Sequence, residues 1–193
     1  MENPSLTENK PMEKKYKTVA SSHISISQLM LPSHTNFSGK IHGGYILSLL
    51  DQIAFACASK FSGNYCVTAS VDTVNFLNPI EVGELVTMKA SVNYVGRSSM
   101  IVGIRVESEN IQTGNKKHCN SSYFTMVAKD SEGNSVKVPG LILSNFEDIK
   151  RFCNSLKQIA LKKERDLHEE VFNYTSKETL EALKKYNIQI NLD

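Results

Sequence analysis

The chain has 193 residues, of which 40% are hydrophobic and 22% charged, and its formal net charge is +2 at pH 7. This composition is typical of a globular protein with one core domain, and so small a charge without a basic, aromatic-rich stripe argues against a nucleic-acid partner. Because no apolar run reaches the length of a membrane span and the amino terminus has no apolar leader, we expect a cytoplasmic protein without a membrane partner.

The first part of the chain is predicted to pass from a flexible lead into a strand and then a loop. Residues 1–15 are polar and include two prolines, so we expect no packed structure there. Apolar and polar residues alternate around Ile24 and Ile26, which predicts a strand within residues 17–30. Residues 32–42 are rich in Ser, Gly and Asn and are expected to form a loop.

The next segment predicts a helix with two features that suit catalysis. Residues 43–61 are apolar nearly all round, so we expect most of the surface of the helix to be covered. Gly43 and Gly44 stand at its start, where unpaired backbone N–H groups stabilise a developing negative charge, although glycine there also permits tight packing. Asp51 has apolar neighbours, so we expect it to be buried, with a raised pKa unless a donor meets it. It is either a general base or nucleophile, or a structural carboxylate that caps a loop or pairs across an interface.

Four further segments alternate between apolar and polar residues and predict strands. They are centred on residues 67–72, 86–94, 102–107 and 116–128. Because no helical pattern separates them, the sheet is expected to be antiparallel. The predicted fold class is α+β, with a curved antiparallel sheet wrapped around one long central helix.

The core is predicted to end near residue 141. We expect a flexible lead (1–15), a core domain (16–141) and a helical carboxy-terminal extension (142–193). Ser144-x-x-Glu147 and Thr175-x-x-Glu178 each match a capping box that precedes apolar residues at helical spacing. The extension is expected to pack on the core or on a neighbouring subunit.

Several other side chains allow two interpretations each. Arg97, Ser98 and Ser99 occupy a predicted turn and offer a guanidinium and two hydroxyls to a phosphate, but a solvated turn has the same composition. His34 and His42 are candidate acid–base groups or structural loop residues. The four cysteines have no zinc-like spacing, so neither a metal nor a cofactor is expected.

The spacing of Gly43 and Asp51 predicts an active site shared between two chains. The two residues are eight positions apart, which corresponds to about 12 Å along a helix, too far to serve one carbonyl carbon. Antiparallel copies of the helix across a two-fold axis would bring Asp51 of one chain near Gly43 of the other. We therefore expect at least a homodimer.

An ordered set of motifs resembles a known enzyme family. Asn36-x-x-Gly-x-Ile-His-Gly-Gly, followed by Leu-Leu-Asp51, is similar to the hotdog-fold acyl-CoA thioesterases of the YciA and brain-type acyl-CoA hydrolase group. The similarity continues through Phe76-Leu-Asn-Pro79, Val82-Gly83-Glu84, Val95-Gly-Arg97-Ser-Ser-Met100 and His118-Cys-Asn120-Ser, and it spans residues 18–141. It implies the hotdog fold, in which a curved sheet wraps a long helix.

The resemblance also implies hydrolysis of acyl-CoA to a free fatty acid and CoA. Asn36 and Asp51 match the catalytic pair of the family, which acts from opposite subunits, with Asp51 as base or nucleophile. Gly43 and Gly44 would stabilise the oxyanion. The residues that match CoA-binding positions are Arg97, Ser98, Ser99, Asn120 and Ser121. Many bacterial members assemble as trimers of dimers, which implies a hexamer.

Departures from the family pattern leave two alternatives open. Lys40 stands where some relatives have a small polar residue, Cys119 where many have threonine, and the segment after residue 141 has no counterpart. A non-catalytic acyl-CoA-binding regulator would bind the ligand without turnover. A hotdog hydratase or dehydratase would need a His–Asp or His–Glu pair, but the predicted helix carries Asp51 and no histidine.

Overall fold

The computed structural model describes residues 15–72, 74–171, 175–183 and 185–190. The chain forms two compact units that meet between Ser155 and Leu156. Nearly all of the predicted lead, residues 1–15, lies outside the described residues. The predicted boundaries at 15 and 141 stay predictions, and the first unit includes the beginning of the helix that follows the sheet.

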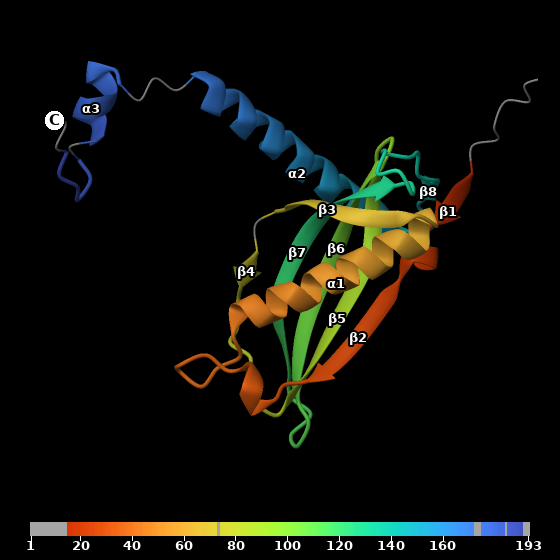
Figure 1. Ribbon diagram of the computed structural model, residues 1–193. Coiled ribbons are helices and arrows are strands. Elements are labelled where there is room, and N and C mark those ends of the chain that lie inside the picture. The colour runs from red at the N-terminus through yellow and green to blue at the C-terminus, as the bar shows by residue number, and fades with distance from the viewer. Residues whose placement is uncertain (1–14, 73, 172–174, 184, 191–193) are drawn as a thin grey trace, which may run out of the picture. The chain divides into compact units, whose positions relative to one another are not determined.

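Figure 1 shows the elements of both units, and their bounds are as follows. The strands are β1 (Tyr16–Thr18), β2 (Ile24–Leu29), β3 (Tyr65–Val71), β4 (Asn75–Phe76), β5 (Glu84–Val95), β6 (Ser99–Asn110), β7 (Lys116–Lys129) and β8 (Gly140–Ile142). The helices are η1 (Val19–Ser22), η2 (Pro32–His34), α1 (Gly43–Ser62), α2 (Phe146–Val171) and α3 (Lys177–Leu183).

The sheet of the first unit is antiparallel, as predicted. Its order is β2-β5-β6-β7-β3, with β4 paired to β7, and β1 pairs separately with β8. Strands β5, β6 and β7 are long and joined by tight turns, so adjacent strands run in opposite directions. Figure 1 shows α1 lying across one face of this sheet. The predicted α+β arrangement of one long helix and a curved antiparallel sheet is therefore confirmed.

The predicted strand over residues 17–30 is wrong in its middle, where η1 separates β1 from β2. Thr18 begins the turn by accepting the N–H of Ser21 on its hydroxyl at 3.3 Å. The buried Ser22 hydroxyl donates to the carbonyl of Val19 at 2.6 Å and accepts the N–H of Val92 at 2.9 Å. These side chains satisfy backbone groups that strand pairing would otherwise use, so the turn replaces the strand locally.

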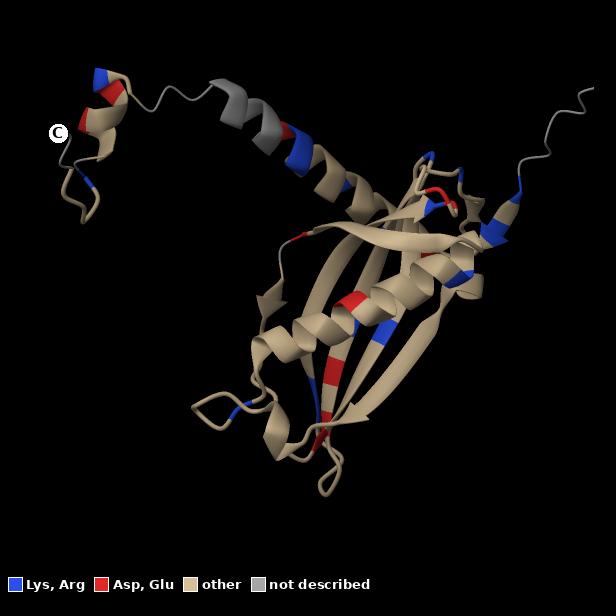
Figure 2. Cartoon of the chain, viewed as in Figure 1, with Lys and Arg blue, Asp and Glu red and all other residues tan. Residues whose placement is uncertain are grey.

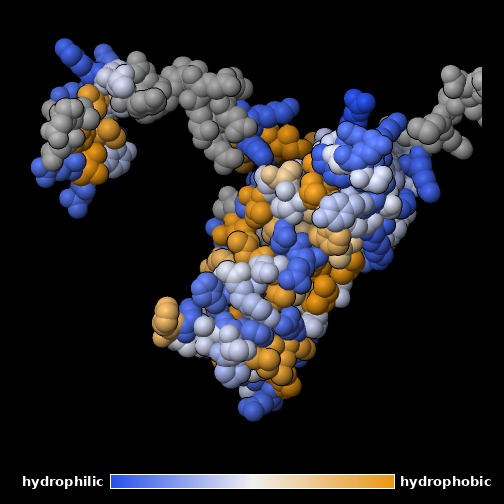
Figure 3. Space-filling view, viewed as in Figure 1, coloured by the Kyte–Doolittle hydropathy of each residue, from blue (hydrophilic) through white to orange (hydrophobic). Residues whose placement is uncertain are grey.

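Helix α1 buries one face only. Ile46, Leu50, Ile53 and Cys57 recur every three or four residues and are almost fully buried beneath the sheet. Gly63, in the left-handed region with φ of 77°, ends the helix. Within one chain the opposite face, which includes Leu47 and Phe55, stays exposed, so the expected cover of most of the helix is not complete in a single chain. Figure 3 shows apolar side chains along the face that α1 presents.

Both predicted capping boxes are shifted by one residue. At the start of α2, Asn145 accepts the N–H of Asp148 at 2.9 Å, and Asp148 accepts the N–H of Ser144 at 3.0 Å. Before α3, the hydroxyl of Ser176 accepts the N–H of Thr179 at 3.1 Å. In each case the residue that follows the predicted N-cap accepts the exposed N–H group. Within the described residues, no helix is both long and apolar enough to span a membrane.

Candidate active site

The loop before α1 is organised by the side chain of Asn36. Its Oδ1 atom accepts the N–H of Ser38 at 3.0 Å, the hydroxyl of Ser38 at 2.8 Å and the N–H of Lys40 at 3.1 Å. Because backbone N–H groups only donate, these contacts fix the orientation of the amide and turn its Nδ2 group away from the loop. Within the described chain Nδ2 meets no acceptor, so Asn36 holds the loop with one atom and offers another as a donor.

The amino terminus of α1 has one backbone donor to spare. His42 caps the helix, and its Nδ1 atom accepts the N–H of Gly44 at 2.9 Å. The Gly43 N–H meets no acceptor among the residues placed in the structure. A Cβ at Gly43 would lie 3.4 Å from the ring of Phe76, so that ring borders the helix terminus. Of the two predicted donors, Gly43 is unpartnered and Gly44 is held by His42.

Asp51 lies in the middle of α1, on the face that turns away from the sheet core. Figure 2 shows acidic colour midway along α1 with uncharged residues on either side, and Asp51 is the acidic residue of this helix in the sequence. The prediction that Asp51 is buried is wrong, because its side chain is exposed beside the edge strand β3. Its Oδ1 atom accepts the hydroxyl of Thr68 at 2.6 Å, a short, charge-assisted hydrogen bond. The helical periodicity that buries Leu50 turns its neighbour outward.

Thr68 was not identified from the sequence. The alternation of residues 67–72 indicates a strand but does not specify which strand borders the helix. A register shift between Thr68 and Ser70 interrupts the pairing of β3 with β7 at this point. The only sequence signal for Thr68 is a hydroxyl in a strand that follows the helix, and many strands contain one.

The turn of Arg97, Ser98 and Ser99 lies at the end of the sheet remote from the start of α1. The N–H of Ala128 donates to the Ser98 carbonyl at 2.9 Å, and the N–H of Val138 donates to the Arg97 carbonyl at 3.0 Å. The Arg97 side chain is exposed. The backbone of the turn is thus fixed, while a guanidinium stands free in solvent for an anion.

The pair Asn120 and Ser121 is divided between the two faces of β7. Asn120 is fully buried on the α1 side, where its Nδ2 donates to the Asn75 carbonyl at 2.9 Å and its Oδ1 has no partner in the described chain. The exposed Ser121 hydroxyl lies on the other face, 2.9 Å from Nε2 of His118. The alternation of a strand imposes this division, so one bound molecule cannot contact both side chains from the same face.

The predicted site residues therefore form three groups within one chain. Strand β4 pairs Phe76 with Asn120, and the Phe76 ring borders Gly43, so these residues share one end of the sheet with the Asn36 loop. Asp51 and Thr68 lie midway along α1. The Arg97 turn belongs to the other end, where Ser99 pairs with Val127. A single chain brings together parts of the predicted site but not the whole.

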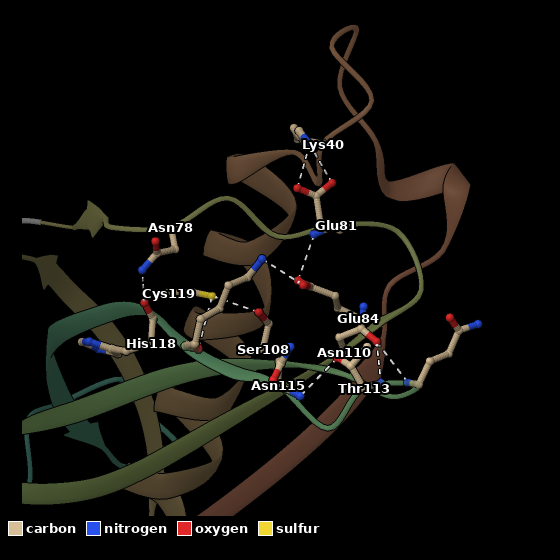
Figure 4. Close-up of polar contacts among 12 residues, drawn as sticks. Lys40, Asn78, Glu81, Glu84, Ser108, Asn110, Thr113, Asn115, His118 and Cys119 are labelled. Atoms are coloured by element: carbon tan, nitrogen blue, oxygen red, sulfur yellow. Dashed lines mark hydrogen bonds and ion pairs between the residues drawn. The ribbon is translucent and has the colours of Figure 1, made fainter.

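A polar network supports the Asn36 loop from below, as Figure 4 shows. Lys40 contacts both carboxylate oxygens of Glu81 at 2.7 and 2.8 Å, and the Glu81 N–H donates to Glu84 at 3.0 Å. Glu84 pairs with Lys117 at 2.8 Å. Burial opposes ionisation of Glu84, but hydrogen bonds from Lys117 and from Glu81 outweigh it and lower the pKa of Glu84. The network ties the loop to the sheet.

Comparison with known proteins finds relatives with this fold. The thioesterase superfamily model covers residues 38–115. The Bacillus subtilis protein YkhA, described as an uncharacterized acyl-CoA thioester hydrolase, is 34% identical over 139 residues, which are 72% of this chain and 81% of that protein. The crystal structure of an apo-hexameric acyl-CoA thioesterase is 33% identical, with a TM-score of 0.77, and the match covers 79% of this chain and 97% of the other.

A second solved enzyme has the same spacing of site residues. The acyl-CoA hydrolase of Staphylococcus aureus, in complex with butyryl coenzyme A, coenzyme A and coenzyme A disulfide, is 28% identical, with a TM-score of 0.74. The match covers 88% of this chain and 99% of that one. Variants of that enzyme replace one asparagine, one aspartate and one threonine by alanine, at positions separated by the same numbers of residues as Asn36, Asp51 and Thr68. The chain belongs to the hotdog-fold acyl-CoA thioesterase family.

Proposed function

We propose that this protein hydrolyses the thioester of acyl-CoA and that Asp51 is its base or nucleophile. The observation that carries this proposal is the Asp51–Thr68 pair, a charged carboxylate held at 2.6 Å by a hydroxyl on an exposed helix face. An exposed carboxylate with one oxygen fixed and the other open to solvent can activate a water molecule or attack a carbonyl carbon.

The rest of the machinery is supplied by a second copy of the chain. Gly43 is about 12 Å from Asp51 along α1, so its N–H cannot reach a carbonyl that Asp51 attacks in the same chain. Strand β3 is a sheet edge beside Asp51, and the exposed rings of Phe55 and Tyr65 contact each other there at 5.5 Å between centroids. Pairing of two copies along this face would cover the apolar side chains and place two helices side by side.

Within such a dimer, the end of the partner helix would stabilise the oxyanion. The Gly43 N–H is the primary donor because it is unpartnered, and the Gly44 N–H becomes available only if His42 releases it. The Nδ2 group of Asn36 lies on the same loop and would orient the attacking water or the thioester. This division agrees with the fixed Oδ1 atom and open Nδ2 group of Asn36.

The proposed CoA contacts lie at both ends of the sheet. The free guanidinium of Arg97, with Ser98 and Ser99, would bind phosphate, while Asn120 and Ser121 would border the path of the CoA chain from opposite faces of β7. Hexameric assembly of a similar thioesterase supports a trimer of dimers for this chain.

Turnover decides between hydrolysis and the two other functions. Release of free CoA thiol from a panel of acyl-CoAs should be rapid for the wild-type protein. A regulator would bind acyl-CoA without releasing thiol, and a hydratase would change the acyl chain while the thioester persists. The spacing shared with the Staphylococcus aureus hydrolase favours hydrolysis.

The variant Asp51→Ala tests the assigned residue. We expect kcat to fall at least about a hundredfold, the scale for loss of a positioned base or nucleophile. Gln52→Ala, at the next exposed position of α1, is the matched control and should keep its kcat. The fold should survive, because an exposed carboxylate contributes little to stability. A folded Asp51→Ala protein with near-normal kcat would assign Asp51 a structural role.

A further inference from the structure

A groove on the opposite side of the sheet from α1 holds none of the residues proposed for the thioester chemistry, although Ser121, a proposed CoA contact, is among its lining residues. In β5, Met88 and Val92 are buried against α1, whereas Lys89 and Ser91 alternate with them and face the other way. On that face lies a cavity of about 610 Å³, bounded by β2, β5, β6, β7 and the first turns of α2. This volume is within the range of small-molecule sites.

The floor of the groove carries a net positive charge. Glu107 accepts hydrogen bonds from Lys89 at 2.8 Å and from Arg105 at 2.9 Å. These bonds lower the pKa of Glu107 to about 2, so it is ionised at neutral pH. Lys89 and Arg105 line the groove, whereas Glu107 holds both of them but is not among the lining residues. We call these three residues the floor triad, whose charge is +1. Arg105 contacts Glu107 through Nε and leaves its two terminal nitrogens open to a ligand.

The wall formed by α2 repeats this arrangement. Glu147 pairs with Arg151 at 3.1 Å and with Lys150 at 3.7 Å, and we call these three residues the helix triad. Its net charge is also +1. Arg151 reaches from α2 to the sheet, where its Nη1 atom donates to the hydroxyl of Ser91 at 3.4 Å. Together with the tilted ring contact between Phe152 and Tyr94, whose centroids are 5.4 Å apart, this hydrogen bond holds the helix triad over the floor.

Between the two triads the floor is hollow and polar. Ser91 and Asn93 are each 4% exposed, and the Ser91 hydroxyl donates to Oδ1 of Asn93 at 2.8 Å. Nδ2 of Asn93 meets no acceptor in the described chain and lies 2.1 Å from where a Cβ of residue 103 would be. Glycine at 103 is therefore needed for Asn93 to occupy this place, and a donor is left at the bottom of the groove.

We propose that this groove binds a diphosphate group, either free or as part of a nucleotide, at a site separate from the thioester. Two triads of charge +1 each match a ligand with at least two negative charges. The two terminal nitrogens of Arg105, the Nη2 atom of Arg151 and Nδ2 of Asn93 provide the directional donors that phosphate oxygens prefer. Lys89 and Arg105 are cross-strand partners in β5 and β6. Ser91, two residues from Lys89, accepts the hydrogen bond from Arg151 of the helix triad. The two triads therefore lie within about 7 Å of each other along the strand.

Calorimetric titration of the assembled wild-type enzyme at low salt tests the proposal, with pyrophosphate, ADP and adenosine as separate probes. We expect pyrophosphate and ADP to bind, with weaker binding as salt is raised, and adenosine not to bind. The double variant Arg105→Gln/Arg151→Gln should weaken both at least about tenfold. The double variant Lys116→Gln/Lys129→Gln removes two cations outside the groove and should bind as wild type. If ADP binds and pyrophosphate does not, the ligand of the groove is a nucleotide rather than a free diphosphate.

Two further measurements separate this site from the CoA site. Arg97→Ala should leave pyrophosphate binding unchanged, and Arg105→Gln/Arg151→Gln should hydrolyse acyl-CoA with wild-type KM and a wild-type unfolding temperature. The proposal is overturned if neither probe binds, if Arg97→Ala abolishes binding while the groove variant retains it, or if the groove variant raises KM for acyl-CoA. The last result would mean that the groove holds the diphosphate of CoA itself. Thioesterase activity is measured independently, so its loss would not affect the diphosphate test.

Discussion

Asp51 and Thr68 belong to different elements, and the hydrogen bond between them sets which carboxylate oxygen is free to react. Oδ1 is held by Thr68 at 2.6 Å, so Oδ2 is the atom available to a water molecule or a thioester. A hydroxyl that donates to one carboxylate oxygen limits the rotation of that carboxylate. In the proposed mechanism Thr68 would therefore be a positioning residue for Asp51.

Thr68→Val removes this donor and keeps the shape of the side chain. A hydrogen bond to a charged group is worth about 1.5–3 kcal/mol, so kcat should fall about tenfold to a hundredfold. Thr68→Ser restores the hydroxyl and should recover most of the activity. Steady-state hydrolysis at saturating acyl-CoA measures both, and an unchanged kcat in a folded Thr68→Val protein would limit Thr68 to packing.

Ionisation of Glu84, which belongs to the network with Lys40, Glu81 and Lys117, makes the stability of the fold depend on pH. Its pKa is lower in the folded protein than its ordinary value of 4.5, so its charge stabilises the fold above that pH. The contribution is lost as the pH falls below 4.5 and through the folded pKa. We expect Glu84→Gln to be less stable than wild type at pH 7 by about 1–3 kcal/mol.

The same variant should lose less stability on acidification than the wild type. Urea unfolding at pH 7 and pH 3 measures this difference directly. Equal losses in the two proteins would show that Glu84 has the same pKa folded and unfolded. Lys116→Gln, which removes a more exposed ion pair with Glu109, is the control and should change the pH dependence little.

At the scale of elements, the loop of residues 36–40 is held by its own turn and by one ion pair. The Asn36 side chain closes the turn, and the Lys40–Glu81 pair connects it to the segment before β5. The family resemblance leads us to expect a small polar residue in some relatives where this chain has Lys40, and we therefore predict that those relatives lack this connection. The loop carries Asn36 and leads directly into Gly43, and its position therefore affects both groups.

Lys40→Met should lower kcat/KM for acyl-CoA a few-fold and leave global stability nearly unchanged. An exposed ion pair contributes less than about 1 kcal/mol, so the effect is confined to the loop. The difference in kcat/KM between Lys40→Met and the wild type should shrink at high salt, because salt weakens the ion pair of the wild type. The charge-swapped double variant Lys40→Glu/Glu81→Lys should recover activity. If it stays as slow as Lys40→Met, the lysine contacts substrate and the ion pair is incidental.

At the scale of the whole molecule, the proposed active site exists only in an assembly. One chain separates Asp51 from Gly43 by about 12 Å along α1 and leaves apolar side chains exposed beside Asp51. In the proposed dimer, burial of that apolar face would stabilise the association and complete the site in the same step. Activity and association are therefore expected to be lost together.

Mixed dimers test this dependence. Asp51→Ala and Asn36→Ala subunits should each be nearly inactive, but dimers refolded from an equal mixture should regain about a quarter of wild-type activity. Half of the dimers are hybrids by random pairing, and one of the two sites in each hybrid has both residues intact. Refolding either variant alone is the control. An active monomer by light scattering, or no recovery on mixing, would place both residues in one chain.

The sequence by itself determined the elements that depend on local pattern. Alternation in β5, β6 and β7 and the apolar run of α1 specify strands and a helix because side-chain period follows backbone geometry. The order of the motifs from Asn36 to Asn120 identifies the family. Spacing alone also excludes a one-chain site for Gly43 and Asp51, since the rise of a helix is fixed.

Only the tertiary structure decided which face each residue occupies and which segments meet. It exposes Asp51, adds Thr68 from β3 and divides Asn120 from Ser121, because burial depends on contacts distant in sequence. Local hydrogen bonds of Ser22 interrupt a strand that the pattern predicts as continuous. The groove over Gly103 likewise forms only when α2 packs on the sheet, since its charges come from elements far apart in the chain.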